Sequence, residues 1–273
     1  MTVLAVSPHL DDAAFSAGGT LAALAATGHA VVVATVFARS VPDPAGFALQ
    51  CQTDKGVPPD EDYMAMRRAE DAAACAALGA EPVWLDLAEA PHRGYDAPAA
   101  LFAGIHPGDE RTWRDVLDRL GALAAARAPG LVLSCQGLGR HADHLHTVRA
   151  VAAWAAESGV PVAWWRDAPY ALRQPEAAAA PHLPPGLDEG AVALGPAALS
   201  AKLDACAAYA TQVPYQFGRD AGGPAEDALR QRLAAFARAE GDRLGAAGPA
   251  EAWAGTAGAL ALLRDASRPT ERR

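Results

Sequence analysis

Short apolar runs alternate with longer segments of helical periodicity along the first part of the chain. Residues 3–7 and 30–37 are continuous and apolar, and the second run is rich in β-branched residues, which is typical of buried parallel strands. Between them, residues 12–27 carry alanine, leucine and phenylalanine at helical spacing, and Gly28 ends that helix. This β-α-β start predicts a parallel sheet.

The same alternation continues along the chain and gives the order β-α-β-α-β-α-β. Strands and helices that alternate in this way form a mainly parallel sheet with helices on both faces, joined by right-handed crossovers. We therefore predict an α/β fold. The further elements are helices over residues 62–78, 112–127 and 143–157, strands over residues 82–87 and 131–134, and a strand that runs into a loop over residues 162–170.

Three segments lack a regular pattern. Residues 40–60 and 88–110 hold prolines, glycines and polar residues without periodicity, and we expect them to be loops that decide specificity, because long loops in compact domains are often binding elements. Residues 174–190, rich in proline and alanine, are assigned no element. The remaining helices are expected over residues 196–210, 224–243 and 250–264.

The length of the chain, 273 residues, suits one sizeable domain. We expect a single domain over residues 1–273, in which residues 1–160 form the core and residues 161–273 complete the sheet and the substrate pocket. Apolar residues make up 51% of the sequence, but their runs are short and dominated by alanine, so no transmembrane segment is expected.

The formal net charge of −9 disfavours polyanionic partners, because binding a phosphate backbone requires a clustered basic face. Nucleic acid is therefore not an expected ligand. The first residues lack the pattern of a secretion signal, so we expect a cytoplasmic location. The cysteines are far apart and form no C-x-x-C pair, which favours small buried hydrophobic residues over a zinc site or a disulfide framework: Cys51, Cys75, Cys135 and Cys206.

Two clusters of histidine and aspartate each follow a predicted strand. Residues 8–13 read PHLDDA, and residues 141–144 read HADH. Ligands of parallel sheets bind beyond the carboxyl ends of the strands, so we expect these remote clusters to meet at one edge. The neighbouring carboxylates Asp11 and Asp12 repel each other, and a bound divalent cation would remove that penalty.

A hydrolytic zinc site uses three protein ligands and keeps a fourth position for water. His9, Asp12 and His144 would form such a set. Asp11, which is not needed as a ligand, could accept the proton of the attacking water and later pass it to the leaving group.

The second cluster also offers groups for the transition state. His141 would face the developing oxyanion, and Asp143 would orient its ring or keep it protonated.

The two clusters resemble the paired signatures of the PIG-L, or LmbE-like, family of zinc-dependent de-N-acetylases. The resemblance implies a Rossmann-like α/β fold and hydrolysis of N-acetyl groups, usually from glycolipids that contain N-acetylglucosamine, thiol glycosides or antibiotic glycosides. By this resemblance, His9, Asp12 and His144 match the metal ligands, Asp11 the general base, and His141 with Asp143 the pair that stabilises the transition state.

The resemblance covers about the first half of the chain. It includes residues 67–70 and 78–79, which are similar to a helix of the family, and a weaker similarity covers residues 202–212. Two positions depart from the family pattern: Leu10 stands in place of proline, and Ala13 in place of glutamate. Neither is a ligand, so we expect the metal site to be kept, whereas the departures leave the choice of substrate open.

Both clusters also have plainer interpretations. The two aspartates could cap a helix, and the histidines of the second cluster could lie on a helix surface, but a cap needs neither a second carboxylate nor an imidazole. His146 does not complete a metallo-β-lactamase motif, because Gly139 stands where the first histidine is required, and we expect it at the surface or behind the ligands. Gly18 and Gly19 lack the G-x-G-x-x-G spacing, so NAD binding is rejected.

We expect Arg67 and Arg93 to contact the substrate, although Arg67 could instead pair with Glu70 on the helix surface. The leading hypothesis is a hydrolase that uses Zn²⁺, or another divalent metal, to remove an N-acyl group, most simply acetyl, from an amino sugar or glycosylated metabolite. The alternatives are an amidase acting on a thiol conjugate or a peptide-antibiotic amide, and a metal-containing accessory protein without turnover. Asp11 speaks against the last, because metal retention alone does not need it.

Overall fold

The computed structural model describes residues 1–218 and 224–268. Its centre is a seven-stranded sheet in the order β3-β2-β1-β4-β5-β7-β6. The first five strands in that order are parallel to one another. β7 is antiparallel to β5, and β6 is antiparallel to β7. The strands are β1 (Thr2–Ser7), β2 (Ala30–Phe37), β3 (Glu81–Leu87), β4 (Leu131–Cys135), β5 (Val162–Trp165), β6 (Asp188–Ala193) and β7 (Ala250–Gly255).

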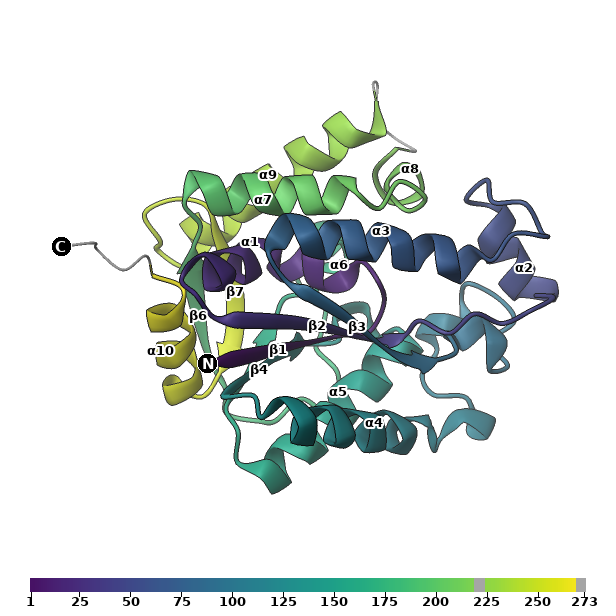
Figure 1. Ribbon diagram of the computed structural model, residues 1–273, viewed down its shortest axis with the longest axis horizontal. Helices are drawn as coiled ribbons and strands as arrows, with labels where there is room; N and C mark the ends of the chain where they lie inside the picture. The colour runs from purple at the N-terminus through teal and green to yellow at the C-terminus, as the bar shows by residue number, and fades with distance from the viewer. Residues whose placement is uncertain (219–223, 269–273) are drawn as a thin grey trace.

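Helices cover both faces of the sheet, as predicted. Figure 1 shows α1, α3, α7 and α9 on one face and α4 and α5 on the other. The α-helices are α1 (Asp12–Ala26), α2 (Gly46–Thr53), α3 (Tyr63–Leu78), α4 (Thr112–Arg127), α5 (Ala142–Ser158), α6 (Tyr170–Arg173), α7 (Pro196–Ala207), α8 (Val213–Phe217), α9 (Ala225–Arg243) and α10 (Ala257–Ala266). Short 3₁₀ helices are η1 (Ala90–His92), η2 (Ala100–Phe102), η3 (Pro107–Asp109) and η4 (Leu138–Arg140).

The central strands bring the two histidine clusters to one edge. β1 and β4 are parallel neighbours, with Val3 opposite Leu131 and Val6 opposite Ser134. Their burial on both faces explains the continuous apolar runs in the sequence. Because both strands end at the same edge, the segments that follow them leave the sheet side by side, which is the convergence that the sequence predicts.

Two sequence-based predictions of secondary structure are wrong. Residues 40–60 are not entirely a loop, since α2 forms within them. Residues 250–264 are not one helix, because β7 precedes α10. Alanine-rich sequence favours a helix locally, but β7 is fixed by its pairing with β5 and β6. β6 begins within residues 174–190, a segment for which the sequence predicts no helix or strand.

Gly18 and Gly19 allow α1 to pack closely against other elements. A Cβ atom on Gly18 would lie 3.1 Å from Lys202 Cγ, and one on Gly19 would lie 2.6 Å from Leu194 Cδ1. The buried carboxylate of Glu251 in β7 accepts hydrogen bonds from the backbone N–H of Gly19 at 3.0 Å and of Thr20 at 2.8 Å. The glycine pair therefore serves helix packing.

No helix within residues 1–218 and 224–268 combines the length and the apolar character needed to cross a bilayer.

We expect Gly19→Ala to lower the free energy of unfolding by about 1–3 kcal/mol, because the added methyl group overpacks the buried side chain of Leu194. Thermal unfolding followed by circular dichroism measures this. Gly121→Ala in α4 is the matched control, since its Cβ would have no atom within 4 Å, and we expect it to leave the melting temperature unchanged or raise it. A Gly19→Ala protein as stable as the wild type would contradict the packing argument.

Candidate active site

The two clusters place three metal-binding side chains around one point. His9 Nδ1 lies 3.2 Å from Asp12 Oδ2, and His144 Nε2 lies 3.2 Å from the same oxygen. One ligand atom from each of the three residues lies within 4.8 Å of those of the other two. Two imidazole nitrogens and one carboxylate oxygen at this spacing are a donor set that suits zinc.

The turn after β1 fixes the first two of these side chains. The Asp12 carboxylate accepts the backbone N–H of His9 at 2.9 Å. The Ser7 hydroxyl donates to the carbonyl of His9 and accepts the backbone N–H of Ala13, at 2.7 and 3.1 Å. The turn is thus held from both ends, and the His9 ring and the Asp12 carboxylate face the cavity together. His144 joins them from the first turn of α5.

Each of the two imidazoles binds a buried carboxylate through its other nitrogen. His9 Nε2 lies 2.9 Å from Asp143 Oδ2, and His144 Nδ1 lies 2.8 Å from Asp167 Oδ1. Such partners fix the orientation of a ligating histidine and the nitrogen that it presents. Among the described residues, the buried His144 Nε2 has no hydrogen-bond partner, so the atom aimed at Asp12 is available to a metal.

Asp167 is a residue of this site that sequence analysis missed. It follows β5 at the same edge of the sheet, within the loop that the sequence predicts after this strand. A carboxylate directly after a strand at this edge is the sequence feature that could have identified it.

Asp11 lies beside the three ligands without joining them. Its Oδ1 is 3.6 Å from Nη2 of Arg67, and Arg67 makes a second ion pair with Glu89. Burial raises the pKa of the Asp11 carboxyl above its ordinary value, and the positive charge of Arg67 opposes that rise. Asp11 is therefore a carboxylate with a proton affinity suited to a base.

The partners of Asp143 differ from those expected. Its carboxylate lies 4.0 Å from His141 Nδ1, whereas it accepts hydrogen bonds from the backbone N–H of Ala90 at 3.0 Å and from Arg93 at 2.6 Å, and contacts His9. The Asp143 backbone N–H, rather than its carboxylate, orients the His141 ring by donating to Nδ1 at 3.2 Å.

His141 is neutral in this arrangement. Burial lowers the pKa of its imidazole to about 3, and the neighbouring His9 adds to that effect. Because Nδ1 accepts a hydrogen bond, the proton of the neutral ring resides on Nε2. His141 can therefore donate one hydrogen bond through Nε2.

The two predicted substrate-binding arginines have different positions. Arg67 lines the cavity beside Asp11, whereas Arg93 is absent from the described lining and is engaged by Asp109 and Asp143. Glu70 does not pair with Arg67; its carboxylate accepts hydrogen bonds from Thr211.

The remaining predictions from single residues are largely confirmed. His146 is buried behind the ligands, with Nε2 at 2.9 Å from Asp109 Oδ2, and is not at the surface. Cys75, Cys135 and Cys206 are buried and free, as expected, whereas Cys51 is only partly buried.

A cavity of about 290 Å³ is lined by His9, Asp11 and Asp12, among others. Its outer wall is built largely by α2, the segment between β3 and α4, and the region of α6 and α8. The segments that were expected to decide specificity therefore do line it. The wall carries four aromatic rings, Phe47, Phe102, Tyr170 and Tyr215, and polar groups of Asp54, Lys55, Arg173, Gln212 and Gln216.

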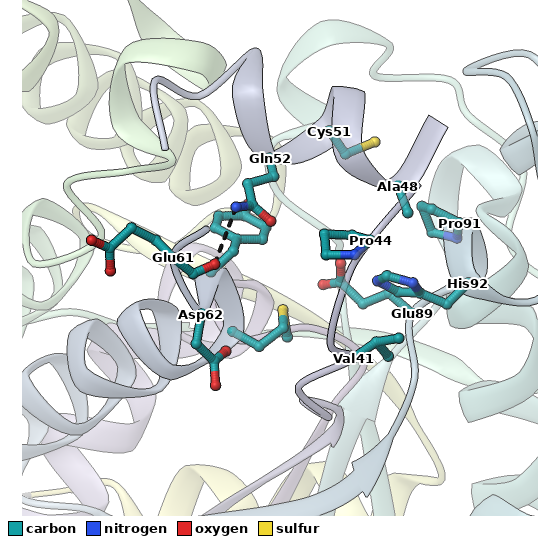
Figure 2. Close-up of a pocket in the computed structure, with 12 residues that line it drawn as sticks. Val41, Pro44, Ala48, Cys51, Gln52, Glu61, Asp62, Glu89, Pro91 and His92 are labelled. Carbon is teal, nitrogen blue, oxygen red and sulfur yellow. Dashed lines mark hydrogen bonds between the residues drawn. The ribbon is translucent and has the colours of Figure 1, made fainter. Parts of the chain in front are cut away.

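A smaller pocket lies next to this cavity and shares Cys51, Glu89 and Pro91 with it. Figure 2 shows α2 above this pocket and the Gln52 side chain turned toward the following loop. The Gln52 amide donates to the carbonyl of Glu61 at 3.1 Å. This bond fastens α2 beside the cavity.

The fold and the site together define a doubly wound α/β protein with a His-Asp-His donor set, suited to a metal ion, at the carboxyl edge of its sheet. Residues 4–155 match the PIG-L family, whose description is GlcNAc-PI de-N-acetylase. This chain belongs to the PIG-L family.

Several deacetylases are similar to this chain. The 2'-N-acetylparomamine deacetylase of Streptomyces fradiae is 34% identical over 170 residues, a match that spans 62% of this chain and 57% of that protein. The zinc-inhibited form of teicoplanin deacetylase has a TM-score of 0.78 at 30% identity, covering 93% of this chain and 97% of that one. The A40926 pseudoaglycone deacetylase has a TM-score of 0.76 at 31% identity, covering 93% and 96%.

A buried carboxyl group lies one helical turn beyond Arg67. Asp71 accepts hydrogen bonds from Trp84 Nε1 and the Tyr209 hydroxyl, each at 2.8 Å. Burial outweighs these bonds and raises its pKa to about 6. Because the folded protein binds this proton more tightly than the unfolded chain does, protonation of Asp71 stabilises the fold at low pH. This stabilisation is lost as the pH rises through about 6.

We therefore expect the free energy of unfolding of the wild type to fall between pH 5 and pH 7 by about 1 kcal/mol more than that of Asp71→Asn, which has no carboxyl group to titrate at this position. Urea unfolding at the two pH values measures the difference. The same substitution at Asp118, which is exposed in α4, is the control and should give no pH-dependent difference. A constant difference for Asp71→Asn would contradict the raised pKa.

Proposed function

We propose that this chain is a zinc-dependent hydrolase that removes an N-acetyl group from an amino sugar of a glycosylated metabolite. The observation that carries the proposal is the His9, Asp12 and His144 set with the carboxylate of Asp11 outside it, next to a cavity that His9, Asp11 and Asp12 line. Membership of the PIG-L family and the similarity to named deacetylases support the same reaction.

In this proposal, His9 Nδ1, Asp12 Oδ2 and His144 Nε2 hold the metal. Bound zinc would polarise the amide carbonyl and lower the pKa of a water molecule to about 7. Asp11 accepts the proton of the attacking water and returns it to the departing amine, which leaves as a neutral group. Asp143 and Asp167 hold the two imidazoles in place.

We assign the oxyanion contact to neutral His141. Its Nε2–H would donate to the carbonyl oxygen as negative charge develops there, and its orientation comes from the backbone N–H of Asp143. We assign substrate contact to Arg67, which lines the cavity. Arg93 is absent from the described lining of this cavity and receives no such assignment.

The cavity favours one class of acceptor over another. The relatives act on acetylated compounds of different kinds, named for paromamine and for teicoplanin. Four aromatic rings on the outer wall, Phe47, Phe102, Tyr170 and Tyr215, offer stacking and apolar surface to a bound molecule. We therefore propose an N-acetylated sugar carried on a large aromatic or apolar group.

The alternatives make different demands on the same cavity. An amidase for a thiol conjugate or peptide-antibiotic amide would release an amine from those compounds but not from N-acetylated glycosides, so a panel of both kinds separates the two. A non-catalytic accessory protein would bind the glycoside and leave it intact when loaded with zinc.

Three broader predictions belong to this proposal. We propose that residues 1–273 act as one domain, with residues 161–273 completing the sheet and the pocket around the core of residues 1–160, which is supported by the position of β5, β6 and β7 in the sheet. The cytoplasmic location and the absence of nucleic-acid binding stay predictions, which cell fractionation and a gel-shift assay test.

We expect Asp11→Asn to lower kcat by about 10²- to 10⁴-fold while zinc content stays equal, because the amide cannot accept the proton and the ligands remain. A fluorogenic assay for free amine on N-acetylglucosamine glycosides, with metal analysis of each protein, measures both. Asp86→Asn, at an exposed position within β3, is the matched control and should retain full activity. Unchanged turnover in Asp11→Asn, or a wild type without bound metal, would refute the proposed function.

The acceptor class gives a second expectation. Phe102 lies at the cavity mouth, with its ring centroid 5.3 Å from that of His141. Phe102→Ala should raise KM about tenfold for glycosides with an aromatic aglycone and by much less for the simple methyl glycoside, since only the former has a ring that can stack on Phe102. Met66→Ala, exposed on α3 away from the cavity lining, serves as the control. Equal losses for both glycosides would contradict the assignment.

A further inference from the structure

A buried ion-pair network fastens the segment between β3 and α4 to the metal-binding residues. At its centre, Arg93 donates from Nε to Asp109 Oδ1 and from Nη2 to Asp109 Oδ2, both at 2.9 Å. The same Nη2 donates to Asp143 Oδ1 at 2.6 Å. One guanidinium therefore bridges two carboxylates that are both buried.

The second oxygen of Asp143 faces the proposed metal ligand. Asp143 Oδ2 lies 2.9 Å from His9 Nε2 and accepts the backbone N–H of Ala90 at 3.0 Å. The two oxygens of this carboxylate are thus divided between Arg93 on one side and His9 on the other. Any rotation of the Asp143 side chain that keeps one of these contacts breaks another.

Asp109 is itself held from several directions. The Tyr95 hydroxyl donates to Oδ2 at 2.9 Å, His146 Nε2 lies 2.9 Å from the same oxygen, and the Thr112 hydroxyl donates to Oδ1. The carboxylate that holds Arg93 therefore has little freedom to move. The Arg93 guanidinium also lies 4.7 Å from the centroid of the Phe37 ring at the end of β2.

A carboxylate that orients a ligating imidazole must stay ionised and must not rotate. A planar guanidinium meets both needs, because it supplies a fixed positive charge and donors in a rigid fork. We propose that Arg93, clamped by Asp109, is a positioning residue that fixes Asp143 and through it the ring of His9, so that the pair sets the metal affinity of the site. This inference rests on the proposed assignment of His9 as a ligand.

A purely structural role in anchoring the segment makes a different prediction. Other bonds also tie this segment down, including that from the backbone N–H of His106 to the Tyr95 hydroxyl at 3.0 Å and that from Ala90 to Asp143. Loss of an anchor alone would lower thermal stability and leave zinc affinity and the metal geometry as they are. A positioning role changes affinity and geometry in protein that is still folded.

The test measures metal binding directly, on the full chain. Zinc dissociation constants come from competition with a chromophoric chelator, and Co²⁺ substitution reports the geometry through its visible absorption. We expect Arg93→Gln to weaken zinc binding about tenfold and to alter the Co²⁺ spectrum. Arg93→Lys should fall between Arg93→Gln and the wild type, because an ammonium keeps the charge but not the fork.

Asp109→Asn and a double variant test whether the two residues act as one unit. Asp109→Asn should weaken zinc binding in the same direction, and the double variant with Arg93→Gln should lose no more than the larger single loss. Arg39→Gln is the matched control, because Arg39 pairs with Asp86 at 3.4 Å on the exposed surface, and it should leave the dissociation constant unchanged. Circular dichroism of the metal-free proteins checks that each is folded.

The outcomes separate this inference from the proposed function. Zinc affinity and Co²⁺ spectra equal to the wild type in folded Arg93→Gln or Asp109→Asn would overturn the positioning role while leaving the metal site in place. A wild type that binds no zinc or Co²⁺ would overturn both. If Arg93→Gln fails to fold, the Lys and Asp109→Asn variants decide by the same readouts.

Discussion

The structure depends on how negative charge is kept at the carboxyl edge of the sheet. Carboxylates from four separate segments gather there with little exposure to water, and uncompensated burial of this kind is unfavourable by several kcal/mol for each charge. Compensation comes from arginines placed by neighbouring segments, from the two imidazoles, and from the cation that the donor set is shaped to hold. The carboxylates concerned are the buried Asp11, Asp12, Asp143 and Asp167, and the partly buried Glu89.

This compensation divides the carboxylates by role. Asp12 shares an oxygen between two imidazoles, whereas Asp143 and Asp167 lie behind those imidazoles and orient them. Asp11 lines the cavity and lies 3.6 Å from Arg67 Nη2. Because Asp11 is not one of the three grouped donors, a change in its protonation would leave that set in place, which supports the proposed role as base.

The sequence predicted the parts of this site that periodicity and motif spacing encode. Apolar runs located β1 and β4, and parallel strands end at one edge, so the meeting of His9 with His144 followed. The partner of Asp143 could not be predicted, because its contacts with Arg93 and Ala90 join segments about 50 residues apart across irregular backbone. β7 could not be recognised because alanine-rich sequence favours helices locally, and pairing with two neighbours decides otherwise.

The two departures from the family motif show where specificity does and does not reside. Leu10 and Ala13 are both buried in the hydrophobic core, and the described lining of the cavity includes neither. The outer cavity wall comes instead from α2, the segment between β3 and α4, and α8. Arg93, in the segment between β3 and α4, contacts Asp143, which in turn contacts His9. In our proposal, a substitution that moves this segment therefore alters the metal site through Asp143. Among the hydrogen bonds of the described residues, α2 has no such connection to His9.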